Sequence, residues 1–160
     1  MHMKLTDVSY GTTSAVITSL AIMIAISGTA NSVVTIITAL LIIAIADNIS
    51  DSFGIHIYAE SEAVNGKEVT RTTMYNFISR VIVVAVFIAF ILLFNMTIAI
   101  ILSITFGLTV IAVVSYYISK MQKKHDMVMS ILKHLLITIA VIIGSFILRI
   151  IISRYIVGML

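Results

Sequence analysis

The sequence predicts an all-α integral membrane protein with five transmembrane helices, on the basis of its composition and of its long apolar runs. Hydrophobic residues fill 61% of the 160 positions, charged residues fill 11%, and the mean hydropathy is +1.19. Soluble domains are about 45–50% apolar and about 25% charged. Because about 20 consecutive apolar residues cross a bilayer core, one membrane domain over residues 1–160 is expected and a water-soluble fold is excluded.

The first two predicted spans cover residues 10–29 and 33–58. Only small hydroxylated residues interrupt the first apolar run, and a helix satisfies such groups through its own backbone. The second run is free of charge from Val33 to Ala46 and then meets Asp47 and Asp51.

The remaining three spans are predicted at residues 75–94, 97–117 and 131–152. The 38 residues from Val81 to Ile118 carry no charge, and as one helix they would measure roughly 57 Å, nearly twice the hydrocarbon thickness. The polar residues Asn95 and Thr97 lie near the middle of this run. The run is therefore predicted to fold as a hairpin that turns at Asn95.

An odd number of spans places the two termini on opposite sides of the membrane. The N-terminal side of the five spans collects most of the basic residues, namely Lys4, Lys67, Arg71, Arg80, Lys120, Lys123, Lys124 and Lys133, against Arg149 and Arg154 on the other side. Basic residues are enriched in cytoplasmic connections. The N-terminus is therefore expected in the cytoplasm, with the C-terminus across what we expect to be a prokaryotic cell membrane.

One alternative concerns the first span, which has some features of a signal peptide. Lys4, the apolar run from Ala15 to Ile26 and the small residues up to Ala30 fit a leader cleaved after Ala30. The basic segment is weak and carries Asp7, so a retained first span is preferred.

The second span carries the most informative residues, a pair of aspartates one helical turn apart. Asp47 lies about 21 Å from the start of the span, inside the hydrocarbon layer. At 100° per residue, one face of the helix also carries Gly54, Tyr58 and Glu62. The candidate ion path comprises the metal ligands Asp47, Asp51, Ser14 and Glu62 and the lining residues Asn48, Thr18 and Tyr58.

A carboxylate at the centre of a bilayer costs about 2.5–3.5 kcal/mol, so it normally faces a partner, a cavity or a cation. The predicted spans place Arg80 at a helix end and Arg149 in the other half of the membrane, so neither is expected to pair with Asp47. A metal ion or bound protons are therefore expected to neutralise the two carboxylates. Two structural readings remain open: the aspartates lie shallower, in water, or Asp47 serves packing alone.

A stripe of small residues follows one face of the first span: Ser14, Thr18, Ala21, Ala25 and Gly28. Such stripes let helices approach closely in lipid, so this face is expected to pack against the acidic helix or against a second copy. The chain has no cysteine and no phosphate-binding glycine loop or nucleophile–base motif. No enzymatic activity, no permanently bound cofactor and no nucleic-acid partner is expected.

Two segments resemble motifs of the vacuolar iron transporter family. Residues 10–21, YGTTSAVITSLA, are similar to the family pattern FGxSDGLVTTLA, and residues 44–62, AIADNISDSFGIHIYAESE, are similar to ALSMAAGEYxSVxSQxE. In this alignment Asp51 takes the place of a family glutamate. Ser14 replaces a family aspartate and Asp47 a family methionine, and the long cytosolic metal-binding insertion is missing.

The resemblance implies five spans, a homodimer through the first and second helices, and an ion path between the two copies. The altered ligands imply an all-oxygen site that prefers hard ions such as Mn²⁺ or hydrated Fe²⁺. The first functional hypothesis is thus a proton-coupled antiporter that moves divalent metal ions out of the cytoplasm. The alternatives are a small proton-coupled exporter of organic cations and a membrane scaffold subunit that transports nothing.

Overall fold

The computed structural model describes residues 5–28, 32–62, 66–123 and 126–156. Five helical segments in this part are long and apolar enough to cross a membrane, and no strand occurs among the described residues. The all-α fold with five membrane-spanning helices is therefore confirmed.

The first and second spans are separated by the undescribed residues 29–31. Helix α1 covers Leu5–Ile26, and the second span is a continuous helical rod made of α2 (Ser32–Ile42), the π-helix η1 (Ile43–Asp47) and α3 (Asn48–Ser61). In a π-helix each amide bonds to the carbonyl five residues earlier instead of four. The residues after it therefore lie on a different helix face than an unbroken α-helix would give them. This π-helix was not predicted; its residues are Ile, Ala and one Asp.

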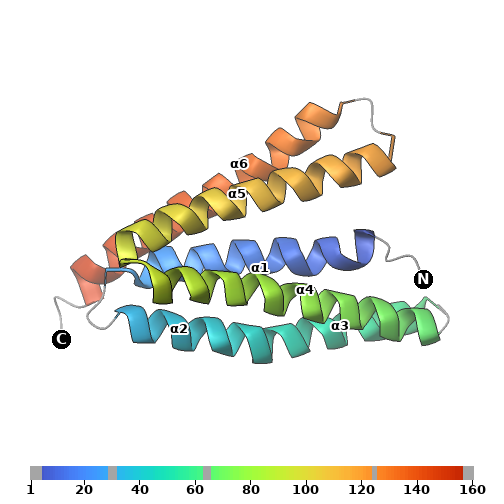
Figure 1. Ribbon diagram of the computed structural model, residues 1–160, viewed down its shortest axis with the longest axis horizontal. Coiled ribbons are helices and arrows are strands. Elements are labelled where there is room, and N and C mark those ends of the chain that lie inside the picture. Colours follow the sequence, from blue (N-terminus) through green and yellow to red (C-terminus); the bar gives the residue numbers. More distant parts are fainter. Residues whose placement is uncertain (1–4, 29–31, 63–65, 124–125, 157–160) are drawn as a thin grey trace.

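The last three spans are α4 (Gly66–Leu93), α5 (Met96–Met121) and α6 (Met127–Ile151), and α6 continues into the π-helix η2 (Ile152–Ile156). The start of α1 and the end of α6 lie at opposite ends of the bundle (Figure 1). Which of these ends faces the cytoplasm stays a prediction from the basic residues.

The predicted hairpin between the third and fourth spans is confirmed. Helix α4 ends at Leu93, and the side-chain Oδ1 of Asn95 accepts a hydrogen bond of 3.0 Å from the Ile98 backbone amide. Asn is among the best residues at this position because its side chain satisfies an amide that the helix itself leaves free.

Asn95→Ala is expected to lower the free energy of unfolding in detergent by about 0.5–2 kcal/mol, because the Ile98 amide loses its acceptor. Thermal unfolding followed by circular dichroism measures this loss. Asn95→Asp is the matched control, since it keeps an oxygen at the same place and should unfold like the wild type. Equal stability of all three proteins would contradict the capping role.

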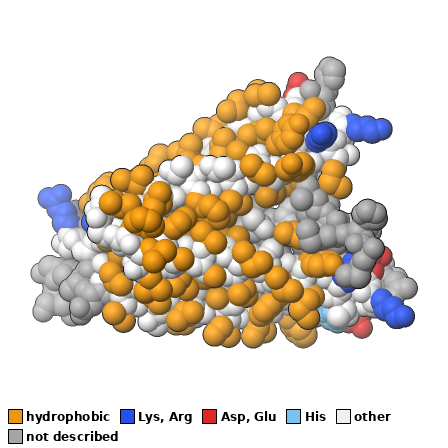
Figure 2. All heavy atoms as spheres, in the orientation of Figure 1, with side chains coloured by type: hydrophobic (Ala, Val, Ile, Leu, Met, Phe, Trp, Pro, Cys, Tyr) orange, Lys and Arg blue, Asp and Glu red, His pale blue; other side chains and the backbone are white. Residues whose placement is uncertain are grey.

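The surface has the distribution of a membrane protein. Large hydrophobic side chains such as Ile45, Phe53, Leu92 and Ile147 are about half exposed or more. Figure 2 shows apolar side chains along the length of the bundle, while lysine and arginine side chains lie at both ends and acidic side chains lie at the right-hand end. The chain is therefore a multi-pass membrane protein.

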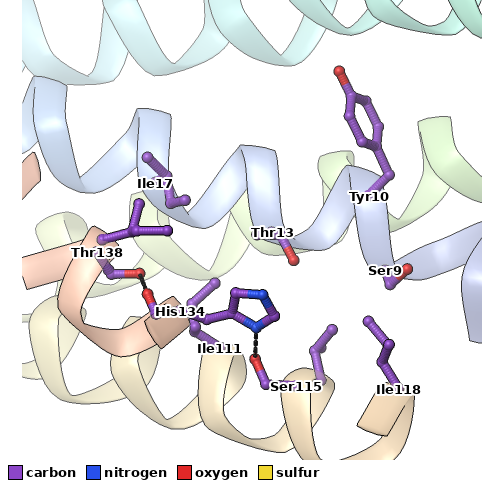
Figure 3. A pocket seen from close by; sticks show the side chains of 11 residues that line it. Ser9, Tyr10, Thr13, Ile17, Ile111, Ser115, Ile118, His134 and Thr138 are labelled. Atoms are coloured by element: carbon purple, nitrogen blue, oxygen red, sulfur yellow. Dashed lines mark hydrogen bonds between the residues drawn. The ribbon is translucent and has the colours of Figure 1, made fainter. Parts of the chain in front are cut away.

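Helix α1 lies at the centre of the bundle and contacts α2, α4, α5 and α6. The α5–α6 hairpin lies against α1 at one end of the bundle and diverges from it towards the other end (Figure 1). The divergence leaves a cavity of about 380 Å³ between α1, α5 and α6 (Figure 3).

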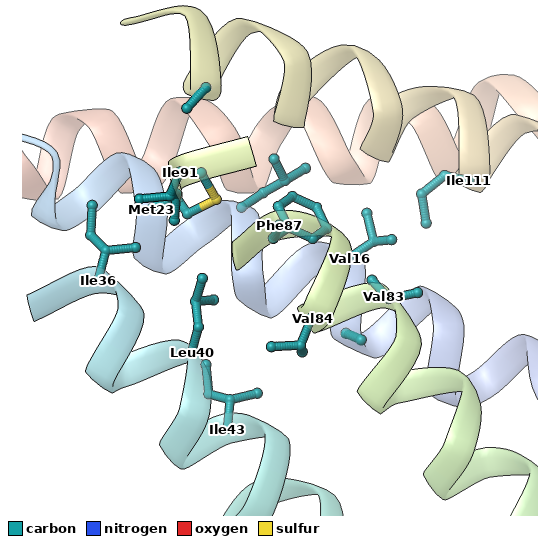
Figure 4. Close-up of a cluster of buried hydrophobic side chains, with 13 residues drawn as sticks. Val16, Met23, Ile36, Leu40, Ile43, Val83, Val84, Phe87, Ile91 and Ile111 are labelled. Carbon is teal, nitrogen blue, oxygen red and sulfur yellow. The ribbon is translucent and has the colours of Figure 1, made fainter. Parts of the chain in front are cut away.

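The apolar core fills the space between α1, the second span, α4 and α5. Its buried members include Val16, Met23, Ile36, Leu40 and Phe87 (Figure 4). The ring of Phe106 on α5 packs edge-on against Phe87 and Phe90, with centroids 5.8 Å apart in each pair. The aromatic contacts join α4 to α5, and the core as a whole holds α4 beside α1 and so positions the polar residues described next.

Candidate functional site

The candidate site is a cluster of charged side chains around Arg80, which lies near the middle of α4 and is buried. Its terminal nitrogens pair with two carboxylates of the second span: Nη1 lies 3.3 Å from Asp47 Oδ2, and Nη2 lies 2.7 Å from Asp51 Oδ2. Because the two aspartates are one turn apart on one helix face, a single guanidinium spans both.

Arg80 also binds the backbone and the first helix. Its Nη1 donates a long hydrogen bond of 3.4 Å to the Asp47 carbonyl oxygen, and its Nη2 donates to the Ser14 hydroxyl of α1. Its Nε has no hydrogen-bond partner among the described residues. One side chain thus ties α1, the second span and α4 together.

The expectation that no arginine pairs with Asp47 is wrong. It assumed that the third span begins at residue 75, which put Arg80 at a helix end. Helix α4 instead begins at Gly66 and ends at Leu93, so Arg80 lies roughly 20 Å from either end. One of the two aspartate charges is thus balanced by Arg80 within the chain, so a metal ion or protons need not neutralise both carboxylates.

The two aspartates keep part of their surface open although their partner is buried. The Asp47 side chain is 44% exposed and that of Asp51 is 28% exposed, against 2% for Arg80. The formal charges of the three groups sum to −1. The cluster thus presents residual negative charge at the outer face of the second span, near its middle.

Asn48, predicted to line an ion path, lies in the interior instead. It is fully buried, and its Nδ2 donates to the backbone oxygens of Phe77 at 3.0 Å and of Ala44 at 3.4 Å. Its Oδ1 is 3.5 Å from the hydroxyl of Ser52, which in turn is 3.5 Å from the Asn76 amide. These bonds hold α3 against α4.

The other predicted site residues are spread along their helices. The Thr18 hydroxyl donates to the Ser14 carbonyl within α1 at 2.9 Å. Tyr58 is 68% exposed, and the exposed Glu62 directly follows α3, about 16 Å along the helix axis from Asp51. The structure brings together Asp47, Asp51 and Ser14, and leaves Glu62 and Tyr58 apart from them.

The close approach of α1 to this cluster depends on a glycine. A Cβ added to Gly11 would lie 2.5 Å from the Asn76 carbonyl oxygen and 2.7 Å from the Ser79 hydroxyl. The Ser79 hydroxyl also reaches the Val8 carbonyl oxygen at 3.4 Å. Gly11 was not among the residues predicted to form this contact, although small residues at helix contacts are typical of membrane proteins.

The described residues contain no group of three or more His, Cys, Asp or Glu side chains placed to hold a metal ion. Within one chain, a cation at Asp47 and Asp51 would have to share their oxygens with the Arg80 guanidinium. A complete metal site at this position therefore needs further ligands or a shift of Arg80.

Comparisons of the chain with protein-family models, with curated proteins and with solved structures gave no match.

Proposed function

We propose that this chain is one subunit of a homodimeric transporter that moves divalent metal ions across a prokaryotic cell membrane in exchange for protons. The observation that carries the proposal is the residual charge of −1 on the Asp47–Asp51–Arg80 cluster, on aspartates 44% and 28% exposed. Ionisable groups inside a membrane span are costly and usually functional.

A second copy of the chain accounts for both the exposure and the charge. A carboxylate facing lipid at mid-span is unfavourable, whereas two copies meeting at this face would cover the four aspartates. Their two clusters would together carry a charge of −2, which one divalent ion balances. Carboxylate oxygens are also the ligands that hard divalent ions prefer.

Protons compete with a metal ion for the same oxygens, since a protonated carboxyl is a poor metal ligand. In this scheme Asp47 and Asp51 bind metal and protons alternately, while Arg80 supplies a permanent positive charge that keeps the metal from binding irreversibly. Ser14 holds the guanidinium near α1.

Asp47→Asn and Asp51→Asn are each expected to abolish metal-driven proton flux in proteoliposomes loaded with a pH-sensitive dye, with Mn²⁺ as the ion. Each change removes one exchangeable charge and leaves the other aspartate to pair with Arg80. Asp126→Asn is the matched control, because Asp126 is exposed at the start of α6, far along the sequence from the cluster. Unchanged flux in both cluster variants would refute the transporter.

A second candidate is the scaffold subunit, and the contacts of Arg80 favour it. From α4, this side chain contacts α1 and the second span, as a group that fixes helix register would. The scaffold predicts that Mn²⁺ leaves the melting temperature in detergent unchanged. A rise for the wild type that is absent in Asp51→Asn would favour the transporter, since a ligand stabilises the state that binds it.

A further inference from the structure

The cavity between α1, α5 and α6 lies apart from the Arg80 cluster and has a different chemistry. Much of its lining is apolar and includes Ile17, Ile111 and Ile137. Its polar groups are hydroxyls and one imidazole, from Ser9, Thr13, Ser115 and His134 among others, and its lining contains no carboxylate. Such a cavity does not attract an organic cation; it suits an apolar chain that ends in a hydrogen-bond acceptor.

His134 supplies the donor for that acceptor. Its Nδ1 lies 2.8 Å from the hydroxyl of Ser115, a buried residue whose one hydrogen-bond partner in the described part of the chain is this ring. The hydroxyl therefore donates to Nδ1, because the reverse arrangement would leave a buried O–H without an acceptor. The other nitrogen then carries the proton, and Figure 3 shows it directed towards Thr13 across the cavity.

His134 lies close beneath the ester and glycerol region of a lipid. His134 is seven residues from the start of α6, about 10 Å along the helix. Helix α5 has 26 residues and α6 has 25, or nearly 40 Å each, so each end extends about 5 Å beyond the hydrocarbon core. The imidazole thus lies a few ångströms inside the hydrocarbon boundary.

The same end of the α5–α6 hairpin carries positive charge. Lys120, Lys123 and Lys133 are exposed there, with Asp126 as the one acidic residue among the described positions from 113 to 140. Long basic side chains near helix ends extend to the interface, where phosphates lie. The lysine ammonium groups therefore lie closer to the membrane surface than the His134 ring does.

We propose that this cavity binds an anionic glycerophospholipid of the adjacent leaflet. One acyl chain occupies the apolar space between Ile17, Ile111 and Ile137, and the His134 Nε2–H donates to an oxygen of the lipid ester or phosphate. Lys120 and Lys133 pair with the phosphate. This site is independent of the proposed transport function.

Native mass spectrometry of the detergent-solubilised protein tests the site by titration with phosphatidylglycerol and with phosphatidylcholine of identical acyl chains. The wild type is expected to bind phosphatidylglycerol on the order of tenfold tighter, because the lysines favour net negative charge. Val114→Phe fills the cavity and should remove this binding. Val113→Phe is the matched control, since Val113 is 47% exposed and does not line the cavity.

A second variant, His134→Leu, keeps the cavity and removes the donor, so the affinity for phosphatidylglycerol should fall about fivefold. Inorganic phosphate at millimolar concentration should not compete, because it has no acyl chain. Equal binding of the two lipids, equal effects of the Val113 and Val114 variants, an unchanged affinity in His134→Leu or full competition by inorganic phosphate would each overturn the proposal. Melting temperatures of the variants separate lost binding from lost folding.

Discussion

Replacing both Asp47 and Asp51 by leucine is expected to lower the free energy of unfolding in detergent by about 3–5 kcal/mol, because it leaves the buried Arg80 without an acidic partner. A guanidinium cannot escape the penalty by losing its proton. Its remaining acceptors are the Ser14 hydroxyl and the Asp47 backbone oxygen, neither of which carries a charge. Thermal or denaturant unfolding of the purified protein measures the loss.

Arg80→Met is expected to destabilise the protein less than this double change. The two carboxylates it leaves behind are 28% and 44% exposed, and each can be neutralised by a proton, which a guanidinium cannot lose. The comparison therefore tests which partner is the buried one. A larger loss of unfolding free energy for Arg80→Met than for the double variant would contradict Arg80 being the buried partner.

The triple variant, with Asp47→Leu, Asp51→Leu and Arg80→Met together, completes the cycle. Replacing a whole buried ion cluster by apolar residues is often neutral or stabilising, whereas removing one side of it is not. The triple variant should therefore recover most of the stability and still be inactive in the flux assay. Recovered stability with unchanged flux would assign the cluster to helix register alone.

How far the sequence predicts this molecule depends on the kind of signal. The hairpin at Asn95 was predictable because 38 uncharged residues cannot form one span and because an asparagine ends the first half. The aspartates of the second span were recognisable because charge is rare inside an apolar run. Both signals are local, and both place residues on helices that the structure contains.

The partner of the aspartates was missed because its position depended on where a helix begins. Residues 66–74 contain charged and hydroxylated side chains, so they were placed outside the predicted span, yet they form the first third of α4. Helices longer than the bilayer core extend beyond it or tilt. With the true start at Gly66, Arg80 falls at the same level as Asp47.

The register between α1 and α4 could not be predicted from the sequence either, since it depends on which glycine meets which backbone atom. The small-residue stripe of α1 included Ser14, and Ser14 does contact Arg80. Gly11 lies three residues before Ser14 and so continues that face of α1, but it was not included in the stripe, and a Cβ there would meet the backbone of α4. A side-chain pattern on one helix does not reveal the facing residues of another helix.

Gly11→Ala is expected to destabilise the protein by about 1–3 kcal/mol, as overpacking of a close contact does. The added methyl group would lie 2.5 Å from the Asn76 carbonyl oxygen, a backbone atom that cannot rotate away. Alanine favours a helix over glycine by up to about 1 kcal/mol, so helix propensity alone predicts the opposite sign. Thermal unfolding in detergent decides between the two.

Gly54→Ala is the matched control, because Gly54 lies within α3 and a Cβ there would meet nothing within 4 Å. This variant should be as stable as the wild type or slightly more so. The double variant Gly11→Ala/Ser79→Ala removes the flexible neighbour but not the carbonyl, so it should stay destabilised. Wild-type stability in that double variant would mean that the Ser79 hydroxyl, and not the backbone of α4, sets how closely α1 approaches Arg80.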